Sequence, residues 1–241
     1  MFCDDGFDGL VIVLDGDFKN INIDKSSGNC EFGGAVSLAK ALNEALNNNL
    51  AGLEFCAGIP GTVGGAVKMN AGRKTRWMSS VLLSVKVINQ NTEVEELTVF
   101  GDEWDYRTSP FLDELVISAN LSLNPVSDDE INQIRKEIDL MNEHRRATQP
   151  VTKASCGSVF KNPEGKSAGE LIESCDLKGV SIGGAKVSDL HANFIVNENN
   201  ATANDVVALI EKIQQAVYDK AGIKLEPELK FIGFSEEVGL F

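Results

Sequence analysis

The sequence has few of the residues that mark disulfide-rich, metal-binding or secreted proteins. It contains only five cysteines in 241 residues, and none of them is paired by C-x-x-C spacing. An odd count without such spacing argues against a disulfide framework and against a zinc site, so we expect no metal. The start of the chain has no basic stretch followed by an apolar run, and so no secretory signal is indicated. We therefore expect a cytoplasmic protein.

Long apolar runs and positive charge are also scarce. The apolar runs at 10–14 and 81–88 are far too short to cross a bilayer. Lys and Arg number 22 against 36 Asp and Glu, which gives a formal net charge of −14. An acidic surface repels nucleic acid and anionic membranes, so we expect neither as a partner. An anionic ligand would need local lysine and arginine side chains to outweigh this field.

The apolar patterning that is present predicts a mixture of strands and helices. Three β-rich segments follow one another at 81–88, 92–99 and 114–123, and the run LVIVL at 10–14 predicts a further buried strand. Residues 37–52 have Leu38, Leu42 and Leu46 at helical spacing, so this segment is predicted to form an amphipathic helix.

Capping signals predict where three more helices begin. Ser127 and Glu130, Ser167 and Glu170, and Thr202 and Asp205 are each three residues apart, which is the spacing of a capping box. The last of these helices is predicted to end at Gly222, with strands at 193–197 and 225–233 on either side of it. The resulting fold class is α+β, with two lobes at 1–124 and 125–241 that meet near the sequence NPV.

Five glycines fall within the segment AGIPGTVGGAVKMNAG at 57–72. Glycine allows a backbone N–H to approach a ligand closely, and clustered N–H groups suit phosphates. The spacing does not match the dinucleotide-binding pattern G-x-G-x-x-G. On the glycine count alone, a tight connecting loop is the more common explanation. A second phosphate-binding pattern is excluded, because GKS at 165–167 has Phe160 where a P-loop needs glycine.

Two further segments contain residues that could take part in catalysis. Tyr106 and Arg107 are adjacent in YRTSPF, and a guanidinium group can bind a carboxylate or phosphate with two hydrogen bonds. A lone arginine more often covers a strand edge. In LEPELKFIG, Glu226 and Glu228 share one face of the predicted strand, where solvent exposure is the usual fate of a carboxylate.

Ser158 lies in CGSVFKNPEG, within a polar, Pro- and Gly-punctuated stretch at 149–166 that we predict to be a loop. A nucleophilic serine needs a base, and the chain offers only His144 and His191. His144 lies in a charged helix end, and His191 is expected to bond locally beside a strand. No G-x-S-x-G elbow surrounds Ser158. A serine hydrolase therefore stays open as a distant alternative.

Five stretches together resemble the UDP-N-acetylenolpyruvoylglucosamine reductase family. They are GIPGTVGGAVKMNAG, YRTSPF, CGSVFKNPEGKSAGELIE, LKGVSIGGAKVSDLHANFIVN and LEPELKFIG, in that family's order and approximate spacing, over about residues 5 to 233. The short connection after YRTSPF is similar to the family's shorter type. The resemblance implies an FAD-binding lobe of the vanillyl-alcohol-oxidase (PCMH) type, followed by a smaller α/β substrate-binding lobe whose last strand, near 225–233, returns to the active site.

The resemblance also implies an activity and a set of residues. The activity is NADPH-dependent, FAD-mediated reduction of the enolpyruvyl group of UDP-N-acetylglucosamine-enolpyruvate to UDP-N-acetylmuramate in peptidoglycan synthesis, by a protein expected to be a monomer. Arg107 would stabilise the enolate, Ser158 would donate a proton, and Glu228 would assist. Tyr106, Lys153, Lys161 and Asn162 would contact substrate. The cofactor contacts would be Gly58, Ile59, Pro60, Gly61, Thr62, Gly64, Gly65, Asn70, Ala71 and Gly72.

One stretch departs from the family pattern. Members carry an upstream glycine-rich loop of the type GxGSNLL, whereas this chain starts at MFCDDGFDG, which resembles the sequence just after that loop. We therefore expect the FAD lobe to lack its N-terminal part. The alternative function is a non-catalytic remnant that binds a UDP-sugar but holds no FAD.

Overall fold

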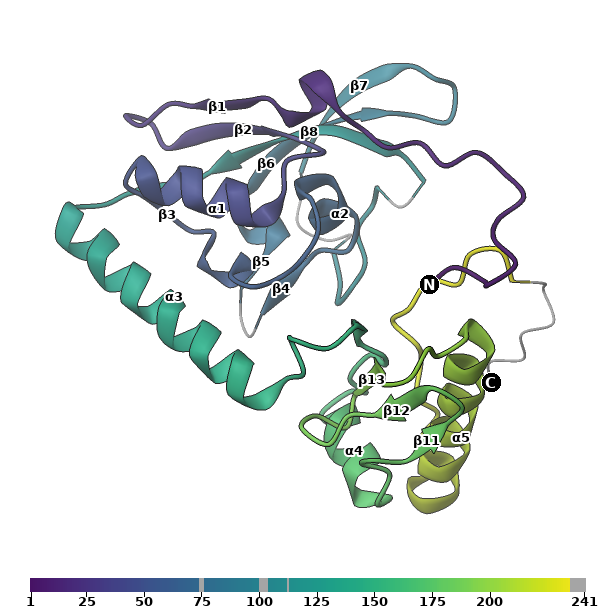
Figure 1. Cartoon of the computed structure of the whole chain (residues 1–241). Helices are drawn as coiled ribbons and strands as arrows, with labels where there is room; N and C mark the ends of the chain where they lie inside the picture. The colour runs from purple at the N-terminus through teal and green to yellow at the C-terminus, as the bar shows by residue number, and fades with distance from the viewer. Residues whose placement is uncertain (74–75, 100–103, 112, 235–241) are drawn as a thin grey trace. The chain divides into compact units, whose positions relative to one another are not determined.

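The computed structural model describes residues 1–73, 76–99, 104–111 and 113–234, which form two compact units (Figure 1). One unit comprises Ile12–Asn142, and the other comprises Met1–Val11 together with Glu143–Phe241. Each unit has its own sheet and its own hydrophobic core. We call them the five-stranded unit and the four-stranded unit and describe each separately.

The five-stranded unit is built on an antiparallel sheet with strand order β1-β2-β8-β6-β7. Its strands are β1 (Ile21–Ile23), β2 (Asn29–Gly33), β6 (Leu82–Ile88), β7 (Val94–Thr98) and β8 (Leu115–Ser122). The three β-rich segments predicted from the sequence are therefore confirmed as β6, β7 and β8. Alternate residues of the central strands, such as Val85 and Ala119, are fully buried and form the core face of the sheet.

Two helices cover this core face, α1 (Leu38–Asn47) and α2 (Val63–Lys68) (Figure 1). The predicted apolar stripe of α1 is confirmed, because Leu38, Leu42 and Leu46 are all buried. Short elements complete the unit: η1 (Gly16–Lys19), β3 (Leu50–Ala51), η2 (Glu54–Cys56), β4 (Gly72–Arg73), β5 (Arg76–Trp77), η3 (Met78–Ser80) and β9 (Asn124–Pro125).

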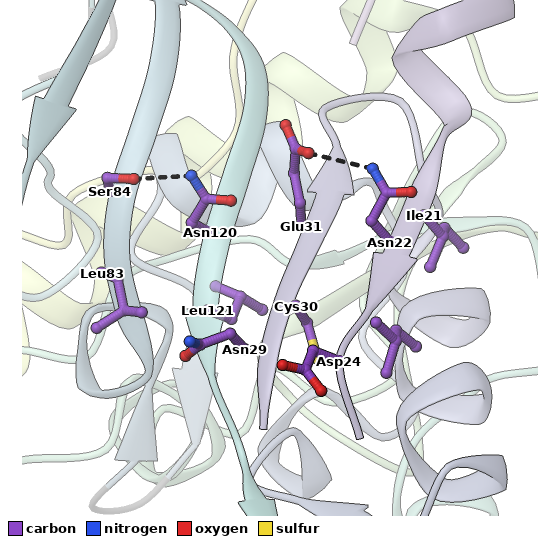
Figure 2. A pocket seen from close by; sticks show the side chains of 11 residues that line it. Ile21, Asn22, Asp24, Asn29, Cys30, Glu31, Leu83, Ser84, Asn120 and Leu121 are labelled. Carbon is purple, nitrogen blue, oxygen red and sulfur yellow. Dashed lines mark hydrogen bonds between the residues drawn. The ribbon is translucent and has the colours of Figure 1, made fainter. Parts of the chain in front are cut away.

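The opposite face of the sheet is polar (Figure 2). Asn22 donates to Glu31 on the next strand, and Asn120 donates to Ser84 at 2.8 Å. Glu31 also accepts a hydrogen bond from Ser118. An open hollow of about 700 Å³ lies here. Its polar groups bond to one another across the strands, as is usual for the solvated face of an antiparallel sheet.

The buried strand predicted at 10–14 is not formed, and that prediction was wrong. No strand is assigned there, and Leu10, Ile12 and Val13 are 83%, 73% and 85% exposed. An apolar run specifies burial only where another element covers it. Within the part of the chain that the structure describes, no strand pairs with this run.

The long helix α3 (Asp128–Thr148) begins at the predicted capping box, where Ser127 and Glu130 bond to each other. Ile131 and Ile138 are buried in the core of the five-stranded unit. The division between the units consequently falls inside α3, between Asn142 and Glu143, and not before it near residue 124. The functional lobes 1–124 and 125–241 stay a prediction.

The four-stranded unit has an antiparallel sheet in the order β10-β13-β12-β11. Its elements are β10 (Ser155–Ser158), α4 (Ala168–Ser174), β11 (Ser181–Ile182), β12 (Ala185–Val187), β13 (Phe194–Asn197) and α5 (Ala203–Ala221). Both predicted caps are confirmed, since Ser167 accepts from Glu170 N and Thr202 forms a full capping box with Asp205. Helix α5 ends as expected at Gly222, whose φ of 66° is left-handed.

Two other predictions for this unit need correction. The stretch 149–166 was expected to be a loop, but it contains β10, because main-chain pairing with β13 forms a strand without any apolar alternation. The stretch 225–233 was expected to be a strand, but it makes only isolated bridges, Phe160 with Pro227 and Phe2 with Ile232. Pro227 has no amide hydrogen to continue a ladder.

Candidate active site

The glycine-rich segment supplies an exposed main-chain rim at the start of α2. Gly58 and Gly61 have φ of 75° and 120°, a conformation that side chains rarely adopt. Gly58, Gly61, Thr62 and Gly65 are exposed, and a Cβ placed on Gly61 would meet nothing within 4 Å. A ligand can therefore reach the backbone at this rim, and these residues fit a phosphate-containing cofactor.

Other predicted cofactor contacts in this segment have structural roles. Gly64 packs α2 against the sheet: its N–H donates to Gly34 O at 2.9 Å, and a Cβ there would stand 3.0 Å from the same oxygen. At Gly72 a Cβ would stand 2.4 Å from Arg76 O. Ala71 is buried, while Ile59 packs partly buried against the core. Their part in cofactor binding stays a prediction.

Asn70 links the glycine-rich segment to the turn that carries Arg107. Its side chain is 4% exposed; Nδ2 donates to Asp105 O at 3.1 Å, and Oδ1 accepts from Ser79 N at 3.1 Å. Both ends of the amide therefore hold main chain. The structure thus brings the cofactor segment and the Tyr106–Arg107 pair together in one unit.

Arg107 lies at the tip of a tight turn and not on a strand edge. Asp105 and Thr108 exchange main-chain hydrogen bonds of 3.3 and 3.1 Å, and Arg107 between them has a left-handed φ of 61°. Its guanidinium carbon stands 5.0 Å from the centre of the Tyr106 ring. The Tyr106 ring in turn contacts Trp77 edge-on at 6.0 Å. The edge-on contact with Trp77 supports the Tyr106 ring, and the face of that ring holds the guanidinium group near it.

Ser158 is the last residue of β10, half-buried, and its strand is held on both sides. On one side Ser158 pairs with Phe194 of β13, and Phe160 exchanges two hydrogen bonds of 2.9 Å with the side chain of Asn193. On the other side Glu228 N donates to Val159 O at 2.8 Å. The segments of Ser158 and Glu228 are therefore direct neighbours. Sequence reasoning missed Asn193, because nothing in spacing or pattern reveals a partner 33 residues away.

The three predicted substrate contacts of the four-stranded unit already have partners. Lys153 pairs with Glu198 at 2.6 Å and Lys161 with Glu226, all in side chains with partial solvent exposure. Asn162 Oδ1 accepts from Ala168 N at 3.0 Å and so supports the start of α4. Exposed ion pairs of this kind contribute little stability, so an anionic ligand could replace either glutamate.

Neither histidine is arranged as a base for Ser158. His191 Nδ1 accepts a hydrogen bond from Asn193 N at 3.2 Å, which confirms the expected local bond. Burial, followed by the charge of Lys178, lowers the pKa of His191, so its imidazole stays neutral near pH 7. His144 is exposed on α3. These positions give no support to a Ser-His-Asp hydrolase.

Other possible sites in the described part of the chain are weaker. The hollow on the polar sheet face (Figure 2) includes none of the predicted site residues in its lining. Residues 1–73, 76–99, 104–111 and 113–234 contain no group of three or more His, Cys, Asp or Glu side chains that could hold a metal ion. None of the helices described is both long enough and apolar enough to span a membrane.

Comparisons with known proteins identify the family of the chain. Residues 149–232 match the family model "UDP-N-acetylenolpyruvoylglucosamine reductase, C-terminal domain", and residues 2–98 match an FAD binding domain. The UDP-N-acetylenolpyruvoylglucosamine reductase of Chloroherpeton thalassium is 41% identical, over 99% of this chain and 78% of its own length. That of Latilactobacillus sakei is also 41% identical, over 97% of this chain and 76% of its own length.

A solved structure shows the same fold. The crystal structure of UDP-N-acetylenolpyruvylglucosamine reductase from Thermus caldophilus superposes with a TM-score of 0.75 at 34% identity, covering 90% of this chain and 76% of the other. The α+β fold with an FAD-binding lobe is thereby confirmed, and a remnant that holds no FAD is not favoured. The chain belongs to the UDP-N-acetylenolpyruvoylglucosamine reductase family, flavin-dependent oxidoreductases of peptidoglycan synthesis that use FAD with NADPH as reductant.

Proposed function

We propose that Arg107, Ser158 and Glu228 perform the reduction of the enolpyruvyl group, with the cofactor held at the rim formed by Gly58, Gly61, Thr62 and Gly65. Bound and reduced FAD would be the source of the hydride for the methylene carbon of the substrate. The electron pair of the double bond then moves onto the neighbouring carbon and its carboxylate as an enolate. The residues of the chain must stabilise that charge and deliver one proton.

Arg107 is the group that stabilises the charge. A guanidinium group is permanently ionised and can bind a carboxylate through two hydrogen bonds. Its stacking on Tyr106 at 5.0 Å and its place on a hydrogen-bonded turn support a preorganised cation. A preorganised charge stabilises the transition state because it needs no rearrangement as the negative charge develops.

Ser158 is the group that delivers the proton, through its Oγ–H, to the enolate carbon. The proton is then replaced from solvent. The observation that supports this most is the Glu228 N–H to Val159 O hydrogen bond, which sets the carboxylate-bearing segment beside the serine-bearing strand. Glu228 is half-buried, and it assists by orienting the hydroxyl or the water that reprotonates it.

The remaining predicted residues bind the substrate. Lys153 and Lys161 offset the net charge of −14 around a UDP diphosphate, and the diphosphate replaces Glu198 and Glu226 as their partner. Tyr106 and Asn162 contact the sugar and phosphate portions. The functional lobes are residues 1–124 and 125–241, and the protein acts as a cytoplasmic monomer without nucleic-acid or membrane partners.

Steady-state kinetics of the FAD-loaded chain test the assignment, with NADPH oxidation followed in the presence of the UDP-sugar enolpyruvyl ether. Ser158→Ala is expected to lower kcat by on the order of 10²-fold or more, which is the usual contribution of a positioned general acid. Ser155→Ala is the matched control, because Ser155 lies on the same strand at an exposed position. Equal activity in the two variants would refute the role of Ser158.

A further inference from the structure

Where β13 stops pairing with β10, the side chain of Asn193 makes the hydrogen bonds that a paired strand would otherwise make. Regular pairing ends at Ser158 and Phe194. One residue before Phe194, Asn193 Oδ1 accepts from Phe160 N and Nδ2 donates to Phe160 O, both at 2.9 Å. The Asn193 carbonyl also accepts from Val159 N at 2.9 Å. One residue thus makes three hydrogen bonds to the two positions that follow Ser158.

These bonds lie in a dry and crowded place. Asn193 is 4% exposed, and Val159 and Phe160 are each 1% exposed. The far edge of the same segment is bonded to Glu228 N and to Glu226 O. In such surroundings a lost bond is not replaced by water, because no solvent reaches the unpaired group.

We propose that Asn193 is a positioning residue for proton transfer from Ser158, an inference that rests on the role proposed above for Ser158. By fixing the main chain of Phe160, it fixes where the Ser158 hydroxyl stands relative to the Glu228 segment. Proton transfer needs heavy atoms about 2.6–3.2 Å apart, and a displacement of roughly 1 Å can lower a rate about 100-fold. Asn193 itself touches neither substrate nor cofactor in this assignment.

The arrangement requires the chemistry of an asparagine side chain. The planar amide offers one donor and one acceptor side by side, which is what a peptide unit offers to its neighbour. An ionised aspartate of the same shape has no donor. Its carboxylate oxygen would repel Phe160 O, which would lose its hydrogen-bond donor. When protonated, the same aspartate regains a donor. Burial raises the pKa of a carboxyl group, so this change is expected to fall in an accessible pH range.

The test is the Asn193→Asp variant of the FAD-loaded chain. At alkaline pH we expect kcat to fall on the order of 100-fold with little change in KM, and to recover as pH is lowered, unlike the wild type. The amides of Val159 and Phe160 should exchange hydrogen faster. Thr202→Ala is the matched control, since it removes a cap in the same unit without touching this segment, and it should leave both readouts unchanged.

A double-variant cycle separates action through Ser158 from general damage. Ser158→Ala with Asn193→Asp should have the same kcat as Ser158→Ala alone, because the group being positioned is already gone. A double variant slower by the product of the two single effects would overturn the proposal, as would wild-type kcat in Asn193→Asp. If Asn193→Asp fails to fold, Asn193→Ala enters the same cycle with the same two outcomes.

The same measurements show which assignment has failed. If Ser158→Ala alone keeps wild-type kcat, the role of Ser158 is refuted and the inference falls with it. If Ser158→Ala is slow but Asn193→Asp is not, only the inference is refuted.

Discussion

The turn of Arg107 and the strand of Ser158 are both held by a buried asparagine, but not equally. Asn70 makes one bond to the Arg107 turn, at Asp105 O, and uses its other end on Ser79. Asn193 makes both side-chain bonds to Phe160, two residues from Ser158. The turn is closed by two main-chain bonds between Asp105 and Thr108, of 3.3 and 3.1 Å, whereas the segment that follows Ser158 is bonded along both edges.

The difference follows the physics of the two tasks. The interaction between two charges falls only as the inverse of their distance, so a cation tolerates small shifts. Proton transfer depends on a hydrogen bond, and a displacement of about 1 Å can slow it about 100-fold. A turn is therefore sufficient to hold the guanidinium group of Arg107, whereas the Ser158 hydroxyl needs a strand that is hydrogen-bonded along both edges.

The largest expected effect tests the charge itself. Arg107→Ala should lower kcat by about 10²–10³-fold, the usual loss for one preorganised donor to a developing anion. Arg107→Lys should lose less, because the charge stays while the second hydrogen bond is lost. Steady-state kinetics at matched flavin content, measured by visible absorption, give the comparison. Equal losses for Lys and Ala would show that geometry and not charge dominates at the turn.

Alkaline pH should weaken the five-stranded unit. Burial raises the pKa of Cys56 to about 12 and of Cys30 to about 11, from an ordinary 9. The two thiols contribute fully to the free energy of unfolding below the unfolded-state pKa of about 9. This contribution is lost as pH rises toward 12, because the thiols of the unfolded chain release their protons first. Each pKa unit corresponds to ~1.4 kcal/mol.

Tryptophan fluorescence measures this loss selectively, since Trp77 and Trp104 both belong to the five-stranded unit. Urea unfolding across that pH range should show a falling midpoint. Cys56→Ala is the control, because its packing defect does not depend on pH, and its curve should be flatter. A midpoint that falls as steeply in Cys56→Ala would contradict the assignment to Cys56.

A smaller effect is expected from Asn70→Ala. The variant removes one hydrogen bond from Asp105 O, which keeps its bond from Thr108 N, and leaves the half-buried Ser79 N without its partner. A polar group left unpaired away from solvent costs about 1–3 kcal/mol. The tryptophan-detected unfolding free energy should fall by about that amount. Because the charge of Arg107 persists, kcat should fall less than in Asn193→Asp. A larger loss of kcat in Asn70→Ala than in Asn193→Asp would contradict the comparison, because it would show that catalysis depends more on the exact position of the Arg107 turn than on that of the Ser158 strand.

The smallest expected effect concerns the four-stranded unit in mild acid. Burial lowers the pKa of His191 below 6.5, so the unfolded chain takes up a proton before the folded chain does. Neutral His191 therefore contributes fully to the free energy of unfolding above pH 6.5, and this contribution is lost as pH falls below 6.5. Hydrogen exchange in β13 should accelerate there. His191→Asn keeps a hydrogen-bond acceptor and should remove the dependence; a dependence that persists would exclude His191 as its source.

Local signals predicted α1, α3, α4 and α5, but not the short helix α2, which lies in the glycine-rich segment interpreted from its glycine count as a loop. The caps at Ser127, Ser167 and Thr202 were found because a capping box is complete within four residues of sequence. The exposed run at 10–14 and the short strand β10 were missed for the opposite reason: whether a segment is covered or paired depends on elements distant in sequence.

The sequence predicted which residues belong to the candidate site, but not how they are arranged in space. Resemblance identified Arg107, Ser158 and Glu228, and their roles stay proposals. The bond from Glu228 N to Val159 O and both asparagine contacts depend on tertiary neighbours. The amide of Asn70 bonds to main chain at both ends, a role that the sequence did not reveal, and its expected part in cofactor binding stays a prediction.

A single-turnover experiment on Ser158→Ala tests most directly whether Ser158 is the proton donor. The FAD-loaded variant is reduced with NADPH without oxygen and mixed rapidly with the UDP-sugar enolpyruvyl ether, and flavin reoxidation and product are followed separately. We expect reoxidation near the wild-type rate and product formation slower by on the order of 10²-fold or more, because only the proton donor is missing. Equal slowing of both signals would contradict this expectation and place Ser158 in the hydride step.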